Sequence, residues 1–376
     1  MATDSTACAV QSGALQGLLS DPNPLVKSLA TSLIGLTCAN SVLGGRVGGF
    51  GVDGDYHDQR TDKEWTGTAV ISYKATDRLL TYLSWSRGFK AGGYNLDRAG
   101  LTITNAQASQ LRFAAEKVDA WELGAKYRGR GFRLGATAFY QMFDNFQLNT
   151  FNGVSFVVEN IQGCSALDGG DAADSDLSAT NGTCAGKNKS GVVSKGVELE
   201  AAIYPLTDVT VEAGYTYAHT GYRHNITGAG GRGLTTSLFQ LPGASLSNAP
   251  RHVVTGSMTW TPPIGLGELR GLIHVDGRYQ SAINVGSDLL PEKAQKAFST
   301  VNARLGISGK DNAWNLEFWA QNLFDVNYKQ TVAGAPIQGS GSLATVAAGG
   351  TSPGNALFIA FPGEPRTYGV TVRTKF

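Results

Sequence analysis

RTYGVTVRTKF, residues 366–376, alternates between two sets of side chains. Successive side chains of a strand point to opposite faces, so this period of two predicts a half-buried β-strand. The strand places an aromatic residue, Phe376, on its apolar side, where soluble domains usually have a frayed polar segment. A strand of this kind fits the wall of a closed barrel, in which the last strand pairs with the first. One face carries Arg366, Tyr368, Val370, Val372, Thr374 and Phe376.

The composition favours a membrane β-barrel over a soluble domain. The chain has 376 residues, 49 of them glycine, and only 16% are charged, whereas a soluble domain has about 25% charged residues. No run of about 18 apolar residues provides a transmembrane helix. Strands that are apolar on one side only explain both observations. The net charge of +1 argues against a nucleic-acid-binding protein, which has a basic excess.

Strand-like alternation repeats from residue 64 onward and predicts about eleven strands of roughly 10–14 residues. In one example, Leu199, Ala201 and Ile203 alternate with Glu198 and Glu200. Short turns at one end and long loops at the other are typical of outer-membrane barrels. The sequence therefore predicts an all-β fold, an antiparallel transmembrane β-barrel with long extracellular loops. The expected turns are 75–78, 129–131, 205–208, 262–267 and 309–312, and the expected loops are 91–115, 149–192, 222–249, 282–297 and 325–363.

Aromatic residues gather near the ends of the expected strands, as in the girdles at the two membrane interfaces of outer-membrane barrels. A soluble β protein with aromatic residues in its core is the alternative explanation. The residues are Trp65, Tyr73, Trp121, Tyr127, Tyr204, Tyr217, Trp260 and Tyr279.

Residues 1–63 lack the strand pattern and form a separate segment of the predicted organisation. Asn23 and Pro24 resemble the N-cap and first position of a helix, and apolar residues follow at helical spacing. We expect a short helix within an extracellular loop. Residues 64–376 form the barrel part.

The four cysteines predict two local disulfides, Cys8–Cys38 and Cys164–Cys184. Each pair brackets a polar, turn-rich segment, and disulfides indicate an oxidising compartment. Four unpaired thiols are the alternative. None of the cysteines forms a CxxC motif and no histidine lies at zinc-ligand spacing, so no metal site or other cofactor is expected.

Several stretches resemble TonB-dependent outer-membrane receptors, specifically the C-terminal half of their barrel. The resemblance covers residues 64–376 and is most similar to receptors for iron complexes. The stretches are EWTGTAVISYKATDRLLTYLSWSRGFKAGGYN (64–95), VDAWELGAKY (118–127), SKGVELEAAIYPLTDVTVEAGYTY (194–217), NAPRHVVTGSMTW (248–260), NLEFWAQNLFDVNY (315–328) and GEPRTYGVTVRTKF (363–376).

The resemblance implies a barrel of about 22 strands around a plug, located in the bacterial outer membrane and surrounded by its lipid. It implies active uptake of a scarce small molecule, a ferric siderophore or another iron complex, driven by the TonB complex through the plug. This sequence lacks a recognisable plug and has half of the strands, so we expect a truncated receptor that begins within an extracellular loop. A passive porin-like channel is the alternative function.

No enzymatic activity is expected, because the sequence has neither a Ser/His/Asp set with a supporting turn nor paired carboxylates in an evident cleft. Binding residues concentrate on loops. The aromatic and polar loop residues that are candidate ligand contacts are Tyr94, Asn95, Phe151, Asn152, Tyr222, Arg223 and Phe239.

The disulfide pattern gives a direct prediction. Peptide mapping under non-reducing conditions should recover Cys8 linked to Cys38 and Cys164 linked to Cys184, since both pairs fall on the predicted extracellular side. A peptide in which Cys38 is linked to Cys164 would contradict the pairing.

Overall fold

The computed structural model describes residues 17–21, 57–95, 107–151, 156–168, 182–234, 238–265, 268–335, 341–342, 354–355 and 357–375. The helix predicted after Pro24 and the Cys8–Cys38 pair lie outside these residues. Within the predicted segment 1–63, the 3-10 helix η1 (Gly17–Ser20) is described. Among the described helices, none is long and apolar enough to cross a bilayer.

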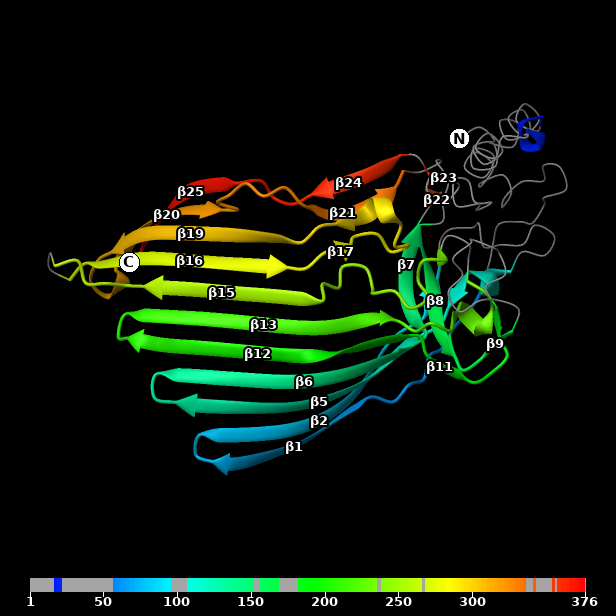
Figure 1. Ribbon diagram of the computed structural model, residues 1–376, viewed down its shortest axis with the longest axis horizontal. Coiled ribbons are helices and arrows are strands. Elements are labelled where there is room, and N and C mark those ends of the chain that lie inside the picture. Colours follow the sequence, from blue (N-terminus) through cyan, green and yellow to red (C-terminus); the bar gives the residue numbers. More distant parts are fainter. Residues whose placement is uncertain are drawn as a thin grey trace.

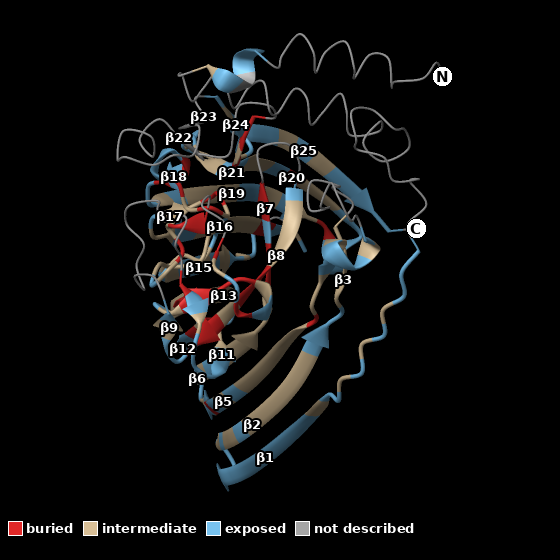
Figure 2. Cartoon of the chain, turned by 90° about the vertical axis from the view of Figure 1, so that its right-hand side faces the viewer, coloured by how far each residue is buried: buried red, intermediate tan, exposed pale blue. Residues whose placement is uncertain are grey.

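Eleven strands form one antiparallel sheet in which neighbours in the sheet are also consecutive wall strands along the chain. The sheet is curved, with β1 and β25 at its two ends (Figures 1 and 2). The all-β class and the strand number are as predicted. In sheet order the strands are β1 (Gly67–Thr76), β2 (Leu79–Lys90), β5 (Glu116–Gly129), β6 (Phe132–Asp144), β12 (Val192–Leu206), β13 (Val209–Tyr222), β15 (His252–Trp260), β16 (Arg270–Gln280), β19 (Phe298–Ser308), β20 (Trp314–Gln321) and β25 (Thr367–Thr374).

The connections alternate between short and long, which confirms the predicted sorting of turns and loops. Short turns join β1 to β2, β5 to β6 and β12 to β13, and all lie at one end of the sheet (left in Figure 1). Gly131 in the β5–β6 turn has a φ of 73°, a conformation that glycine adopts without steric cost. All five long connections emerge at the opposite end, here called the loop end.

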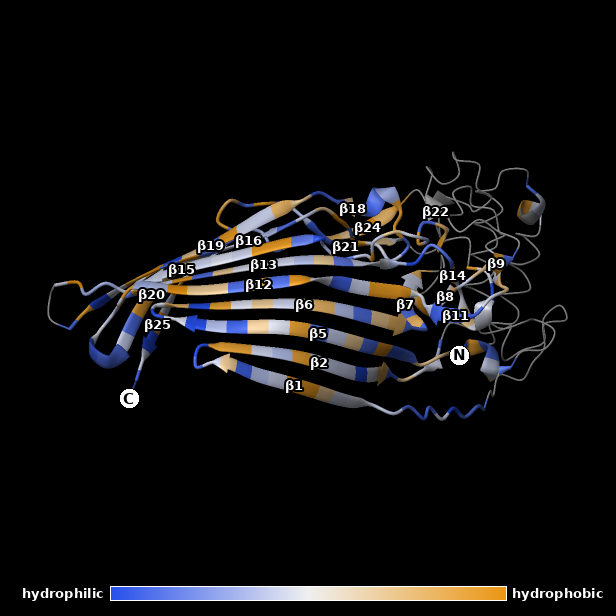
Figure 3. Ribbon diagram, turned by 60° about the horizontal axis from the view of Figure 1, so that its bottom comes forward, coloured by the Kyte–Doolittle hydropathy of each residue, from blue (hydrophilic) through white to orange (hydrophobic). Residues whose placement is uncertain are grey.

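The two faces of the wall differ in chemistry, and hydrophilic and hydrophobic residues are interspersed along the wall strands (Figure 3). One face carries exposed apolar side chains, such as Leu123 (60% exposed), Leu199 (47%) and Val372 (66%). The other face carries polar groups and glycines: the Tyr82 hydroxyl lies 3.2 Å from that of Thr137. Side chains alternate along every strand, so one sheet presents a lipid-compatible surface outward and a polar surface inward.

Aromatic side chains form a belt near each end of the apolar face. At the loop end, Trp85 lies between Trp65 and Trp121, with ring centroids 5.6 and 6.3 Å apart. At the turn end, Tyr127 and Phe132 are 5.7 Å apart. Between Trp65 and Tyr73 the extended chain covers about 26 Å, or about 20 Å along the membrane normal at the usual tilt of outer-membrane strands.

The loop end contains a second, smaller sheet of β7 (Phe146–Phe151), β8 (Phe156–Cys164), β11 (Asn188–Ser190) and β14 (Ile226–Thr227), in which β8 is central. The main apolar cluster of the described residues is located here and includes Val192 and Tyr222 at the loop-end termini of β12 and β13. Further short pairs are β3 (Gly93–Tyr94) with β4 (Arg112–Phe113), β9 (Leu167–Asp168) with β10 (Thr183–Cys184), β17 (Ile283–Asn284) with β18 (Ala294–Gln295), β21 (Lys329–Gly334) with β24 (Phe358–Pro362), and β22 (Gly341–Ser342) with β23 (Gly354–Asn355).

The two faces of β12 give a matched pair of substitutions. Leu199→Arg places a charge on the apolar face between the belts, so it should lower the free energy of unfolding by about 2–4 kcal/mol. Glu200→Gln, on the polar face, should change it far less. Denaturant titration in lipid measures both values, and equal sensitivity at the two positions would indicate a soluble core instead.

Candidate functional site

The inner face of the wall is lined by charged side chains around a hollow of about 980 Å³. Lys126, Arg128 and Arg133 project from β5 and β6, whereas Glu200 and Glu212 project from the neighbouring β12 and β13. Among the described residues, none of these five forms an ion pair. The wall therefore presents a basic sector beside an acidic sector, and both are available to a polar occupant of the lumen.

A hydrogen-bonded row crosses the inner face of β15, β16 and β19. The Thr259 hydroxyl lies 2.8 Å from His274 Nδ1, and His274 Nε2 lies 3.3 Å from Asp276 Oδ1. Asn302 Nδ2 donates to Asp276 Oδ2 (2.7 Å), and Asn302 Oδ1 accepts from the backbone N–H of Asn322 (3.0 Å). The row thus ties the wall to the segment that leaves β20.

In this row a hydroxyl, an imidazole and a carboxylate follow one another in space. The amino-acid sequence did not reveal the arrangement, because the three residues lie on two strands. Acyl-transfer chemistry also needs free N–H donors aimed at a developing oxyanion. The backbone of β15 and β16 around Thr259 is paired within the ladder, with Thr259 opposite His274. The row therefore fits a structural link between strands.

At the loop end, the hairpin of β7 and β8 packs on the inner side of the wall. Leu148 and Ile161 of the hairpin join Val192 and Tyr222, from the ends of β12 and β13, in one buried cluster. The Phe146 ring meets the Tyr222 ring edge-on at 6.3 Å. Figure 1 shows the hairpin running across the wall strands and not along them.

Polar side chains fasten the opposite face of the hairpin to the β2–β5 connection. Asn160 accepts from the Ala114 N–H (2.6 Å) and donates to the Ala114 carbonyl (3.1 Å). Asn95 pairs in the same way with the Val158 backbone, at 2.7 and 3.0 Å. The Gln147 amide donates to the carbonyls of Ala91 and Ala114. The hairpin is therefore held on both faces. We call the small sheet to which it belongs, β7, β8, β11 and β14, the mouth platform.

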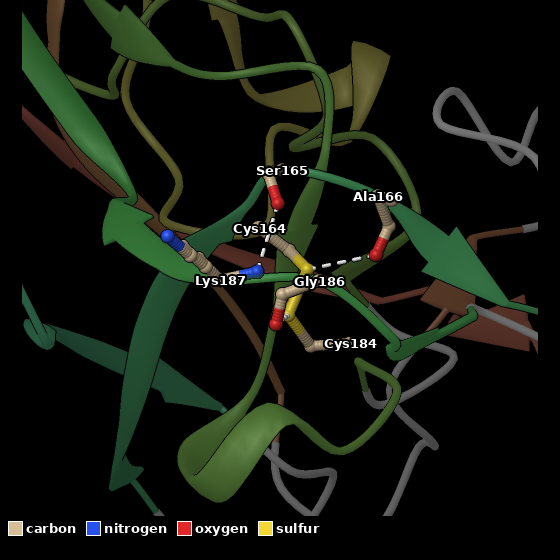
Figure 4. Close-up of a disulfide and its surroundings, with 6 residues drawn as sticks. All are labelled: Cys164, Ser165, Ala166, Cys184, Gly186 and Lys187. Atoms are coloured by element: carbon tan, nitrogen blue, oxygen red, sulfur yellow. Dashed lines mark hydrogen bonds between the residues drawn. A yellow bond between two sulfur atoms is a disulfide. The ribbon is translucent and has the colours of Figure 1, made fainter.

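Cys164 and Cys184 are joined by a disulfide across 20 residues, one of the two pairings that the sequence predicts. Cys164 is the last residue of β8, and β11 returns to pair with β8 at Asn188. The Lys187 N–H donates to the Ser165 hydroxyl (2.8 Å) beside the bond (Figure 4). The disulfide therefore links the end of β8 to the segment that leads into β11 of the mouth platform.

Ion pairs hold the rim near β3 and β4. Arg112 makes a two-pronged pair with Asp58, and Arg60 makes one with Asp62, which also accepts from the Gly92 N–H (3.0 Å). The hydrogen bond from Arg60 holds the pKa of Asp62 below its usual value. These four charges are thus paired with each other.

Most of the residues that the sequence predicts as ligand contacts are buried or hydrogen-bonded within the protein. Phe151, Tyr222 and Phe239 are buried. Asn95 is paired with the Val158 backbone, and Arg223 donates to the Ser190 carbonyl (2.9 Å). Tyr94 lies on β3, near the rim ion pairs. Asn152 lies outside the described residues. Five of the residues surround the mouth platform, but Phe239 belongs to a different cluster with Leu290, and contact with a ligand stays a prediction for all seven.

Asp288 and Lys293 form an ion pair that the sequence did not indicate. Both are almost fully buried (3% and 2% exposed), and Lys293 Nζ lies 2.6 Å from Asp288 Oδ2. The ammonium group lies 5.7 Å from the centre of the Phe358 ring on β24. Both residues belong to the β16–β19 connection, and the contact of Lys293 with Phe358 joins this connection to β24, which is distant in the sequence.

Asn160 gives a test of the platform. Asn160→Ala removes the side-chain partner of the Ala114 N–H and of the Asn145 carbonyl, whereas Gln147 still donates to the Ala114 carbonyl, so the variant should destabilise the platform by at least about 2 kcal/mol. Asn149→Ala, at an exposed neighbouring position of β7, should change it by less than about 0.5 kcal/mol. Hydrogen exchange at β8 measures both, and a similar loss of protection in the two variants would contradict the assigned role of Asn160.

Glu159 makes the platform sensitive to pH. Burial raises the pKa of Glu159, and Arg232 offsets part of this rise. The folded carboxyl holds its proton more tightly than the unfolded one, so stability falls as pH rises from about 4.3 through the raised value. Glu159→Gln should remove this dependence, whereas Glu292→Gln, at an exposed site, should keep it. Protection of β8 amides, corrected for intrinsic exchange rates, measures the effect.

Comparison with known proteins gives a family and a fold. The β-barrel model of the TonB dependent receptor-like family matches residues 40–323. Among curated proteins, none matches the chain.

Three solved structures show the same fold at low identity. The ferric yersiniabactin uptake receptor from Yersinia pestis is similar with a TM-score of 0.57 and 18% identity, over 83% of this chain and 37% of that one. The copper transporter OprC has a TM-score of 0.52 and 12% identity, over 82% and 38%. The siderophore receptor PiuA from Acinetobacter baumannii has a TM-score of 0.50 and 15% identity, over 82% and 35%. The chain thus spans less than two fifths of each of these proteins.

Proposed function

The chain belongs to the TonB-dependent receptor-like β-barrels of the bacterial outer membrane, and from this we propose that it is the C-terminal part of the wall of an active importer. The observation that carries the proposal is the two-sided wall, apolar and belted with aromatic residues outside and charged inside. A passive porin-like channel finds no support in the described residues or in the comparisons.

We propose a ferric siderophore or another iron complex as the ligand. The wall stretches resemble receptors for iron complexes, and two of the three similar structures are receptors for a ferric siderophore or a siderophore. The ligand enters at the loop end, where Tyr94, Asn95, Phe151, Asn152, Tyr222, Arg223 and Phe239 are the proposed contacts. Residues 1–63 contribute an extracellular segment in this scheme, and residues 64–376 contribute the wall.

We propose that import is powered by the TonB complex, acting through a plug domain inside the completed barrel. The plug would meet the inner face, where the basic sector of β5 and β6 lies beside the acidic sector of β12 and β13. The chain supplies the wall and the mouth in this scheme. Chemistry on the ligand plays no part in it.

The ligand is tested by fluorescence quenching of the purified chain in detergent. A ferric siderophore should quench the tryptophans saturably, and the same siderophore without iron should bind more weakly. The panel includes ferric citrate, haem, copper ions and a neutral glycan. Saturable binding of copper or the glycan alone would overturn the iron assignment but would leave the family intact.

The open sheet predicts that this chain does not form a closed pore alone. The outer edges of β1 and β25 have no partner strand among the described residues. An unsatisfied backbone group costs several kcal/mol in a bilayer, so two edges cost on the order of tens of kcal/mol. We expect the 376-residue chain to need further strands, a second copy or tighter curling. Import of an iron chelate by monomeric chain in liposomes without TonB would contradict this.

A further inference from the structure

A compact loop connects the wall strands β16 and β19 at the loop end. β17 pairs with β18 and closes this loop. Inside it, Asn284 Nδ2 donates to the Leu290 carbonyl (2.8 Å), and the N–H of Val285 donates to the Lys293 carbonyl (3.0 Å). The loop is therefore fixed by hydrogen bonds of its own. We call residues 284–295 the bridging loop.

The buried ion pair of Asp288 and Lys293 lies inside the bridging loop. Lys293 Nζ donates to Asp288 Oδ2 (2.6 Å), and Asp288 Oδ1 accepts from the Leu290 N–H (3.3 Å). The stem of Lys293 packs against Gly286, where a Cβ has no room. Both charged side chains are buried, so the loss of one would leave the other without compensation. The shape of the loop therefore depends on both charges.

One side of the bridging loop binds the hairpin of β21 and β24. Gln295 Oε1 accepts from the Lys329 N–H at the start of β21 (2.8 Å). The Lys293 ammonium group lies 5.7 Å from the centre of the Phe358 ring on β24, and Phe358 packs against the buried cluster that contains Leu290. Because β24 is the strand that precedes β25 along the chain, this contact reaches the segment that leads into the edge of the wall.

The other side of the bridging loop contacts the mouth platform. Leu289 packs against the apolar cluster that contains Leu148 and Ile161 of the platform, whereas its neighbour Leu290 lies in the separate cluster with Phe358. Leu289 has a φ of 60°, a left-handed conformation that a leucine keeps only where surrounding contacts hold it. Two adjacent side chains of the loop thus enter two different clusters, one on the platform side and one on the hairpin side.

We propose that the bridging loop couples the mouth platform to the β21–β24 hairpin, so that loosening one of these elements loosens the other. The Asp288–Lys293 pair holds the loop in the shape that brings Leu289 to the platform and the ammonium group to Phe358. Coupling between distant elements is carried by packed side chains that touch one another, and it acts equally in both directions. The inference concerns the mouth without a ligand, so it does not depend on the identity of the imported molecule.

The test measures hydrogen exchange of the full chain in dodecylphosphocholine micelles without ligand. Asp288→Asn leaves the Lys293 ammonium group buried without a carboxylate, so exchange at the β24 amides should rise by at least about tenfold. Because Leu289 transmits the change, exchange at the β8 amides should rise by at least about threefold. Lys296→Gln, at an exposed site next to the loop, should leave both rates unchanged. The amides of β12 and β13 should stay protected in every variant, which reports that the wall is folded.

A second variant separates coupling from a general loss of stability. Leu289→Ala removes the contact with the platform but keeps the ion pair. In this background, Asp288→Asn should still raise exchange at β24 by at least about tenfold, whereas exchange at β8 should change by less than about twofold. Unchanged exchange at either β24 or β8 in the single Asp288→Asn variant would overturn the proposal, as would an equal rise at β8 in the two backgrounds. None of these outcomes bears on the proposed ligand, because the test uses none.

Discussion

The structure depends on one constraint: a strand in hydrocarbon has no water to satisfy its backbone N–H and C=O groups. Only a neighbouring strand can do so, and the nine inner strands of the eleven-stranded wall pair antiparallel on both sides, whereas β1 and β25 pair on one side only among the described residues. The ladder runs through β12, for example, with twelve consecutive paired positions to β6. Short turns at one end keep this register, since a hairpin fixes the pairing of its two strands.

The same constraint explains why the wall has no core of its own. A single sheet between lipid and lumen has one apolar face and one polar face, and neither packs against a second layer. Among the residues that the structure describes, the buried apolar clusters therefore lie at the loop end. There, Leu148 and Ile161 pack against the ends of β12 and β13, and asparagine side chains satisfy the backbone of irregular segments that a ladder no longer pairs.

The sequence predicted the wall far better than the mouth, for a physical reason. Strand alternation is a local signal, so Leu199 and Glu200 reveal their faces without any knowledge of their neighbours. The loop end depends on contacts between distant segments, such as Asn160 with Ala114 and Lys293 with Phe358. Residues in loops are usually exposed, and the sequence analysis expected this of Tyr222 and Phe151. Both are buried, and the polar residues around them in the sequence gave no sign of it.

The burial of these aromatic residues bears on how a ligand is selected. A side chain inside the platform core acts on a ligand mainly through the shape that it maintains, because direct contact requires an exposed surface. The platform is fixed to the wall on one face and to the β2–β5 connection on the other, and a disulfide closes its β8–β11 excursion. Such a unit behaves as part of the wall. In the importer that we propose, selection at this mouth combines a fixed boundary, set by buried residues, with contacts from the side chains on the surface of the platform.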